Sequence, residues 1–325
     1  MGAGCVCRAG SCEASELVDW WPSFGYFADG FLKQWNAPDR FPVRPSVVAM
    51  TASFEARRVY VADGVAHRSV DHLEGEDSFE WVPVPTEDRI RAAHIAYGHG
   101  YMIAENDHVY FTDSALTPVW RTDDLGPVAE VCLGAFDNAM VLLRDGRVLA
   151  TGSNTELLGT NGVVPPEHGF LEVTYPRPVV SLACTGQASI AILDDGTAWF
   201  TGPPNQLPGP PEPAQPSAPV PRLADLRLTR RFERAISTYF DGSQGFCVAG
   251  SEIAGGYACW TDRRYERPAM VWSALPRLPV EIREGGDGIC GRFDVGFGRQ
   301  EIRCIAGSDP SLVAVLVWST ARIGT

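Results

Sequence analysis

Short runs of apolar residues alternate with polar turns along the whole chain, and one pattern recurs at a spacing of about 50 residues. Its clearest copies are residues 141–152 and 190–202, each an apolar run, an Asp-Gly pair and a second apolar run. Asp145-Gly146 and Asp195-Gly196 supply the positive φ that a tight hairpin of the primed type requires. Each copy therefore predicts a β-hairpin, and the period predicts a repeat architecture.

Five weaker copies of this hairpin flank the two clear ones. Asp29-Gly30 and Asp63-Gly64 keep the turn, residues 101–112 lose its glycine, and the two downstream copies have longer glycine-rich turns. The seven predicted hairpins are 26–35, 60–67, 101–112, 141–152, 190–202, 246–260 and 289–305.

A further short apolar run precedes each hairpin. The seven runs are 17–21, 47–51, 90–96, 128–133, 179–184, 232–238 and 278–282. Three or four short strands repeated seven times, with almost no helical periodicity, are typical of blades around a central axis. The sequence therefore predicts an all-β protein, a seven-bladed β-propeller.

The two central repeats resemble those of the regulator of chromosome condensation family. The residues that carry the resemblance are Val131-Cys-Leu-Gly134, Asp145-Gly146, Thr151-Gly-Ser-Asn154 and Leu158-Gly159 in one repeat, and Ala183-Cys-Thr-Gly186, Asp195-Gly196, Gly202, Asn205 and Leu207-Pro-Gly209 in the next. Asp137 and Ser189 replace the histidine that usually follows the first glycine. The resemblance implies the propeller fold, and one use of such a propeller is guanine-nucleotide exchange on a small GTPase.

Length favours one large propeller over two average domains. We expect a Cys-containing tail over residues 1–15, a single propeller over 16–325 and a proline-rich inter-blade loop over 203–221, where proline cannot donate to a sheet ladder. No segment approaches the roughly 18 to 20 apolar residues of a membrane span. Ser311 to Trp318 is a candidate strand to close the ring beside residues 17–21.

The charge balance bears on partners. The chain has 40 acidic and 27 basic residues, a net charge of −13, and Lys33 is its one lysine. Because an acidic surface repels the phosphate backbone, nucleic acid is not an expected partner. We predict a protein partner and a monomeric propeller.

Aromatic and basic residues supply candidate contacts for that partner. Tryptophan is enriched at interface hot spots, and Trp81 and Trp120 lie outside the predicted hairpins, whereas Trp35, Trp199 and Trp260 recur at a similar repeat position that indicates blade packing. The pairs Arg230-Arg231 and Arg263-Arg264 are further candidates on one rim. Packing between blades and a solvated surface are the alternative interpretations of these residues.

The nine cysteines are compatible with either a reducing or an oxidising compartment. Cys247 with Cys259, and Cys290 with Cys304, are placed symmetrically about predicted turns, where cross-strand disulfides can form. Two such bridges would indicate an oxidising compartment, whereas buried free thiols are the alternative. No signal peptide precedes the chain as written, which favours the cytoplasm unless the start is incomplete. Cys5, Cys7 and Cys12 lack a fourth zinc ligand nearby, so no metal is predicted.

Catalytic motifs and cofactor fingerprints are not found in the sequence. His94, His99 and His108 fall in one blade and are interpreted as ordinary strand and loop residues. Some propellers are glycan-active enzymes with carboxylates at the central funnel, and Asp19, Glu130 and Glu233 are the candidates to point there, but the fold alone does not imply an enzyme. We therefore predict a non-enzymatic propeller that binds a macromolecule, with an extracytoplasmic recognition or inhibitor propeller stabilised by hairpin disulfides as the alternative.

Overall fold

The structure, a computed structural model, contains seven four-stranded antiparallel sheets and one separate two-stranded hairpin. Side chains are described over residues 59–70, 80–96, 98–135, 137–203, 220–221, 223–224, 231–237 and 245–250, and the strands elsewhere by their bounds and register alone. Each four-stranded sheet is built from consecutive strands of the chain, so each is one blade.

The strands of each blade run in chain order across its sheet. Blade 1 consists of β3 (Leu17–Trp21), β4 (Phe24–Phe27), β5 (Phe31–Gln34) and β6 (Arg40–Pro42), and blade 2 of β7 (Val47–Ala52), β8 (Arg58–Ala62), β9 (Val65–Asp71) and β10 (Phe79–Pro83). Blade 3 consists of β11 (Ile90–Ala96), β12 (His99–Ala104), β13 (Val109–Thr112) and β14 (Pro118–Thr122), and blade 4 of β15 (Val128–Leu133), β16 (Ala139–Leu143), β17 (Val148–Thr151) and β18 (Leu171–Val173). Blade 5 consists of β19 (Val179–Cys184), β20 (Ser189–Leu193), β21 (Ala198–Gly202) and β22 (Ala218–Leu223). Blade 6 consists of β23 (Arg234–Phe240), β24 (Ser243–Ala249), β25 (Tyr257–Thr261) and β26 (Met270–Val271). Blade 7 consists of β27 (Glu281–Gly285), β28 (Gly288–Gly296), β29 (Arg299–Ala306) and β30 (Val313–Ser319).

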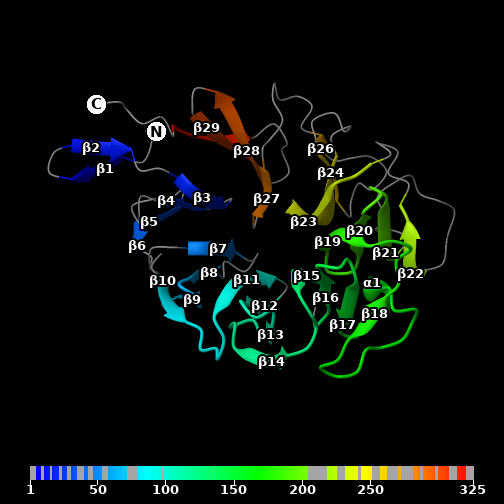
Figure 1. Cartoon of the computed structure of the whole chain (residues 1–325). Coiled ribbons are helices and arrows are strands. Elements are labelled where there is room, and N and C mark those ends of the chain that lie inside the picture. Colours follow the sequence, from blue (N-terminus) through cyan, green and yellow to red (C-terminus); the bar gives the residue numbers. More distant parts are fainter. Residues whose placement is uncertain are drawn as a thin grey trace.

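The first strands of the seven blades gather around a common centre, and the later strands of each blade lie progressively farther out (Figure 1). Five pairs of neighbouring first strands are in contact: β7 with β11, β15 with β19, β19 with β23, β23 with β27, and β27 of the last blade with β3 of the first. The fold is a seven-bladed β-propeller, as predicted.

The predicted apolar runs coincide with these innermost strands. Runs 17–21, 90–96, 128–133 and 179–184 match β3, β11, β15 and β19 at both ends, and β7 extends one residue beyond its run. The last two runs begin before their strands β23 and β27. In blade 6 the reason is Phe232, which is buried against the neighbouring blade before the ladder begins.

Two turn types underlie the recurrent Asp-Gly pairs. At Asp63-Gly64 both residues have positive φ, 53° and 79°, as a primed turn requires. At Asp145-Gly146 only the glycine has positive φ, 88°, and the Gly146 N–H donates a hydrogen bond to the Leu143 carbonyl at 3.0 Å. This is a type I turn closed by a left-handed glycine, and Asp195-Gly196 repeats it. The prediction of primed turns is therefore wrong for these two hairpins, because the aspartates keep negative φ.

Three of the turn glycines also join their blade to the next. In three places the turn carbonyl accepts a hydrogen bond from the residue that enters the following blade: Ile90 to Gly64 at 2.7 Å, Val179 to Gly146 at 2.9 Å and Phe232 to Gly196 at 2.7 Å. The approach leaves no room for a side chain, since a Cβ at Gly146 would lie 2.5 Å from Cβ of Pro178. Glycine is thus required both for its φ and for this close contact. Asp29-Gly30 lies outside the described residues, between β4 and β5.

The described core lies between blades rather than within them. Along β20, Ile190 and Ile192 pack toward blade 6, whereas Ala191 and Leu193 pack toward blade 4. Both faces of such a strand are buried, so all five residues of β16 and of β20 are buried. This two-sided burial explains why the central strands appear in the sequence as continuous apolar runs.

Strands occur near both ends of the chain. Residues 1–15 include the hairpin of β1 (Cys5–Arg8) and β2 (Ser11–Ala14), in which Cys7 lies opposite Cys12. At the other end, β30 pairs with β29 of its own blade. The prediction that residues 311–318 complete the first blade is therefore wrong: blade 1 takes all four of its strands from residues 17–42.

The predicted proline-rich loop is shorter than expected. Its last residues belong to β22, the outermost strand of blade 5. Pro219 and Pro221 are tolerated there because an edge strand has one side that needs no ladder donor. In the described part of the chain, no helix is long and apolar enough to cross a membrane; α1 (Thr155–Leu158) has four residues.

Substitution of a turn glycine tests the contact between blades. We expect Gly146→Ala to lower the free energy of unfolding by about 2–4 kcal/mol, because it adds a clash with Pro178 to the strain of positive φ. Gly126→Ala is the matched control, since Gly126 has φ 90° and nothing within 4 Å of the added Cβ. Denaturant unfolding measures both variants, and equal losses would show that the contact contributes nothing.

Candidate interaction surfaces

A polar network covers the hairpin-turn end of blade 3. The carboxylate of Asp88, in the loop before β11, accepts hydrogen bonds from the Tyr110 hydroxyl at 2.7 Å and from the Asn106 amide at 3.0 Å, and lies 2.9 Å from Nδ1 of His108. These hydrogen bonds, the one from Tyr110 first, hold the pKa of Asp88 below its ordinary value. The loop between blades 2 and 3 is thereby fixed to the β12–β13 turn.

Arg121 on β14 extends this network. Its guanidinium donates to Asp123 at 2.6 Å and to Glu87 at 2.7 Å, and lies 5.8 Å from the centre of the Tyr110 ring. Hydrogen bonds to Tyr110 and to the two carboxylates raise the pKa of Arg121 above its ordinary value. The cation is therefore fully engaged within the protein.

Every arginine between residues 80 and 203 is engaged in this way. The segment contains 16 acidic residues and six arginines, with no lysine. The ion pairs are Arg89–Glu105, Arg91–Asp107, Arg121–Glu87, Arg144–Asp107, Arg147–Asp145 and Arg177–Asp194. These pairs are at least partly exposed and contribute little to stability, but they leave residues 80–203 with an uncompensated negative charge.

Aromatic rings stack at the outer edge of blade 3. The Trp120 ring lies 4.3 Å from Phe111 and 5.2 Å from His168, both nearly parallel to it, and 5.6 Å from Phe170. Phe111 belongs to the same blade, whereas His168 and Phe170 come from the connection that leads into β18 of blade 4. Trp120 is half-buried and joins the two blades.

Trp81 occupies the corresponding place in blade 2, in the middle of outer strand β10. Its ring meets Tyr60 edge-on with centroids 4.6 Å apart, and Tyr60 stacks on His67. Both predicted contact tryptophans thus pack on their own blades and keep only part of their surface exposed. A role for either in partner binding stays a prediction.

The predicted basic rim is only partly described. Arg231 is exposed and lies at the entry to blade 6, where its side chain and backbone cover Gly196. Arg230, Arg263 and Arg264 lie outside the described residues. Of these four arginines the structure thus places Arg231 alone, and it lies at the entry to blade 6 rather than beside Trp81 of blade 2 or Trp120 of blade 3.

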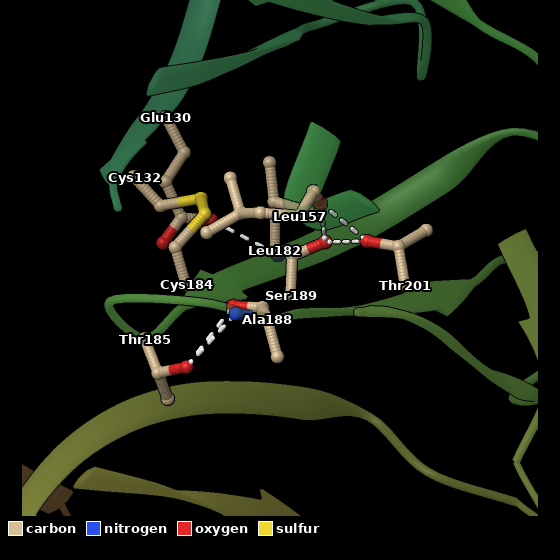
Figure 2. The surroundings of a disulfide bond; sticks show 9 residues. All are labelled: Glu130, Cys132, Leu157, Leu182, Cys184, Thr185, Ala188, Ser189 and Thr201. Carbon is tan, nitrogen blue, oxygen red and sulfur yellow. Dashed lines mark hydrogen bonds between the residues drawn. A yellow bond between two sulfur atoms is a disulfide. The ribbon is translucent and has the colours of Figure 1, made fainter. Parts of the chain in front are cut away.

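A disulfide joins the inner strands of blades 4 and 5 (Figure 2). Cys132 on β15 is bonded to Cys184 on β19, with 5.4 Å between their Cα atoms. Val128 and Val179 occupy equivalent positions, each paired with the leucine that ends the adjacent strand. Cys132 lies four residues after Val128, but Cys184 lies five residues after Val179. Successive side chains of a strand point to opposite faces of the sheet, so this difference of one residue places the two cysteines on opposite faces of their blades. Cys132 therefore points toward blade 5 and Cys184 toward blade 4, and the two meet.

The predicted hairpin cysteines have the expected register. Cys247 lies opposite Cys259, and Cys290 lies opposite Cys304. Cys247 is disulfide-bonded, while the side chains of the other three lie outside the described residues. The sequence analysis missed the bond between Cys132 and Cys184, because the resemblance aligns both cysteines to one repeat position.

Glu130 lies beside the disulfide on the same strand. One carboxylate oxygen accepts a hydrogen bond from the Leu182 N–H of blade 5 at 3.4 Å (Figure 2). Burial raises the pKa of Glu130 to about 7, against the weaker opposing effects of that hydrogen bond and of Arg234. Among the other predicted carboxylates, Glu233 is exposed, and the side chain of Asp19 lies outside the described residues.

The histidines of blade 3 fall in two places. His94 on β11 stacks on Tyr101 at 5.6 Å, and its pKa is lowered to about 4 by burial and by nearby His99 across the turn. His108 belongs to the polar network instead. No group of three metal-ligating side chains occurs among the residues whose side chains are described.

Comparisons with known proteins place the fold. No protein-family model and no curated protein matches the sequence. Human WBSCR16 matches with a TM-score of 0.60 at 14% identity, over 82% of this chain and 78% of its own. Prp20p from Saccharomyces cerevisiae, the yeast RCC1, matches with a TM-score of 0.54 at 14% identity, over 73% and 69%. BBS1N, in complex with ARL6DN, matches with a TM-score of 0.51 at 12% identity, over 93% and 88%. The chain thus has the fold of RCC1-type propellers.

The raised pKa of Glu130 predicts a pH-dependent stability. Because the folded pKa of about 7 exceeds the ordinary 4.5, the stabilising effect of the protonated form is complete below about pH 4.5 and is lost as the pH rises through 7. We expect Glu130→Gln, which keeps an acceptor for Leu182, to be more stable than the wild type by about 1–3 kcal/mol near pH 8 and nearly equal to it at low pH. A difference that does not vary with pH would contradict this assignment.

Removal of the inter-blade disulfide tests its contribution. We expect Cys132→Ala/Cys184→Ala to lower the free energy of unfolding by about 2–4 kcal/mol, because the bond spans 52 residues and restricts the unfolded chain. Denaturant unfolding without reductant measures the loss. In the presence of reductant the wild type should lose more stability than the variant, and an equal loss would argue against the bond.

Proposed function

We propose that this chain is a non-enzymatic propeller that binds a protein partner carrying a basic surface. The observation that carries the proposal is the charge of residues 80–203, in which all six arginines are paired with carboxylates of the chain and carboxylates remain in excess. Complementary charge steers association and selects partners. The inter-blade core and hydrogen bonds hold this surface rigid, which lowers the cost of binding.

A regulator or exchange factor of a small GTPase is the finer form of this proposal. Its support is the resemblance of the central repeats to the family of exchange propellers and the shared fold with Prp20p, whose binding to Gsp1p and histones is known. BBS1N, of the same general fold, forms a complex with ARL6DN. Each of these propellers binds another protein, and the acidic surface here suits a basic one.

A second candidate is an extracytoplasmic recognition or inhibitor propeller. The disulfide of Cys132 with Cys184 and the bonded state of Cys247 favour it, because disulfides persist in oxidising compartments. Counting free thiols in the denatured, unreduced protein separates the two compartments. Nine free thiols would point to a reducing one, whereas at most five remain if Cys132, Cys184, Cys247 and a partner of Cys247 are all bonded.

Two assays test the proposed function. We expect the purified chain to retain a protein from the lysate or the culture medium of its source, with retention falling steeply between about 0.05 M and 0.3 M salt because charge drives it. A release assay with labelled nucleotide on a panel of small GTPases tests the exchange role. No acceleration at high propeller concentration would rule out exchange, and retention insensitive to salt would rule out a charge-driven interface.

A further inference from the structure

The connection from α1 to β18 forms an arm, residues 159–170, that spans three blades. At its start Gly159 lies against Thr201 and Pro221 of blade 5, where a Cβ would come within 2.7 Å of Thr201. At its end the His168 ring stacks on Trp120 of blade 3. The arm is therefore fastened to a neighbouring blade on each side of its own.

The arm is also ordered internally. The Thr160 hydroxyl donates to the Val163 carbonyl at 2.6 Å, and the Val163 N–H donates back to the Thr160 carbonyl at 3.0 Å. Asn161 and Gly162 between them both have positive φ, which defines a tight primed turn. His168 has positive φ as well, 57°, a conformation that non-glycine residues rarely adopt and that clusters at functional sites.

This rigid arm presents two adjacent apolar side chains to solvent. Val163 and Val164 are 54% and 59% exposed, whereas the next residue, Pro165, is buried. Among the described residues they are the one sequential pair of exposed large apolar side chains. A fixed apolar pair gains free energy on burial in a partner without the entropic cost of ordering a flexible loop.

The charge around the arm indicates what covers it. Glu167 lies within the arm and Glu172 just after it, and both are exposed. Glu172 shares Arg147 with Asp145, which forms the closer ion pair at 2.8 Å against 3.8 Å for Glu172. An apolar contact bordered by exposed carboxylates is complementary to a pocket with a basic border. A second copy of this chain is a poor fit, because its described surface is acidic.

We propose that the arm is the docking element of this propeller, with Val163 and Val164 inserted into an apolar pocket of a partner protein that is bordered by lysine or arginine. This inference rests on the proposed function and names the element that performs it. The outer edge of blades 3 and 4, rather than the central channel, is then the site of contact.

The test compares matched valine variants of the full chain. We expect Val163→Asn/Val164→Asn to retain at least about tenfold less of the partner captured by the wild type, with unchanged thermal stability because both side chains are exposed. Val180→Asn is the control, since Val180 is 52% exposed but lies on inner strand β19. A photo-cross-linking residue at position 164 should link to the partner, and one at position 180 should not.

The outcomes of these experiments distinguish a failure of the arm as docking element from a failure of the proposed function. Loss of capture with the arm variant alone, together with cross-links from position 164 to an apolar segment flanked by basic residues, supports the arm. Capture that persists in the arm variant, cross-links from position 180 or cross-links to a second copy overturn the arm while the proposed function stands. No capture by the wild type at any salt concentration overturns both.

Discussion

The hydrogen bond from the turn of one blade to the entry of the next is the constraint on which the rest of this propeller depends. It appears at Gly64, Gly146 and Gly196, each time with the glycine carbonyl as acceptor. Because the turn lies against the next inner strand, it fixes where that strand begins, and the strand then fixes the register of its own blade. At these three junctions the Asp-Gly pair therefore specifies both the hairpin and the position of the next blade.

Once that spacing is set, small register differences decide which side chains meet between blades. A bulge near the start of the inner strand recurs in blades 1 to 5. The residue after it reaches the neighbouring blade: Ser181 exchanges hydrogen bonds with the backbone of Ala235, and Glu130 accepts one from Leu182. A further shift of one residue in blade 5 turns Cys184 back toward Cys132. The same alternation of faces thus produces a hydrogen bond at one seam and a disulfide at another.

The sequence predicted the features that depend on local chemistry. The apolar runs and the turn residues predicted seven hairpins and the inner strands, because both signals depend only on residues that are close together in the sequence. The bond between Cys132 and Cys184 was missed because it depends on the relative register of two blades 52 residues apart. Trp81 and Trp120 fall outside the hairpins in sequence, yet each finds an aromatic partner on its own blade. The arm was not predicted either, because its anchors at Trp120 and Thr201 lie in different blades.

The exposed arm and the paired arginines both follow from the way this chain satisfies its contacts internally. The described blades are held together by apolar layers and backbone hydrogen bonds, and the six arginines of residues 80–203 are paired with carboxylates of the same surface. What remains for a partner is therefore negative charge and those apolar groups that the blades cannot cover. A connection fixed at Thr201 on one side and at Trp120 on the other cannot fold its two valines back into the core. The rigidity that orders the propeller is thus also what keeps Val163 and Val164 exposed.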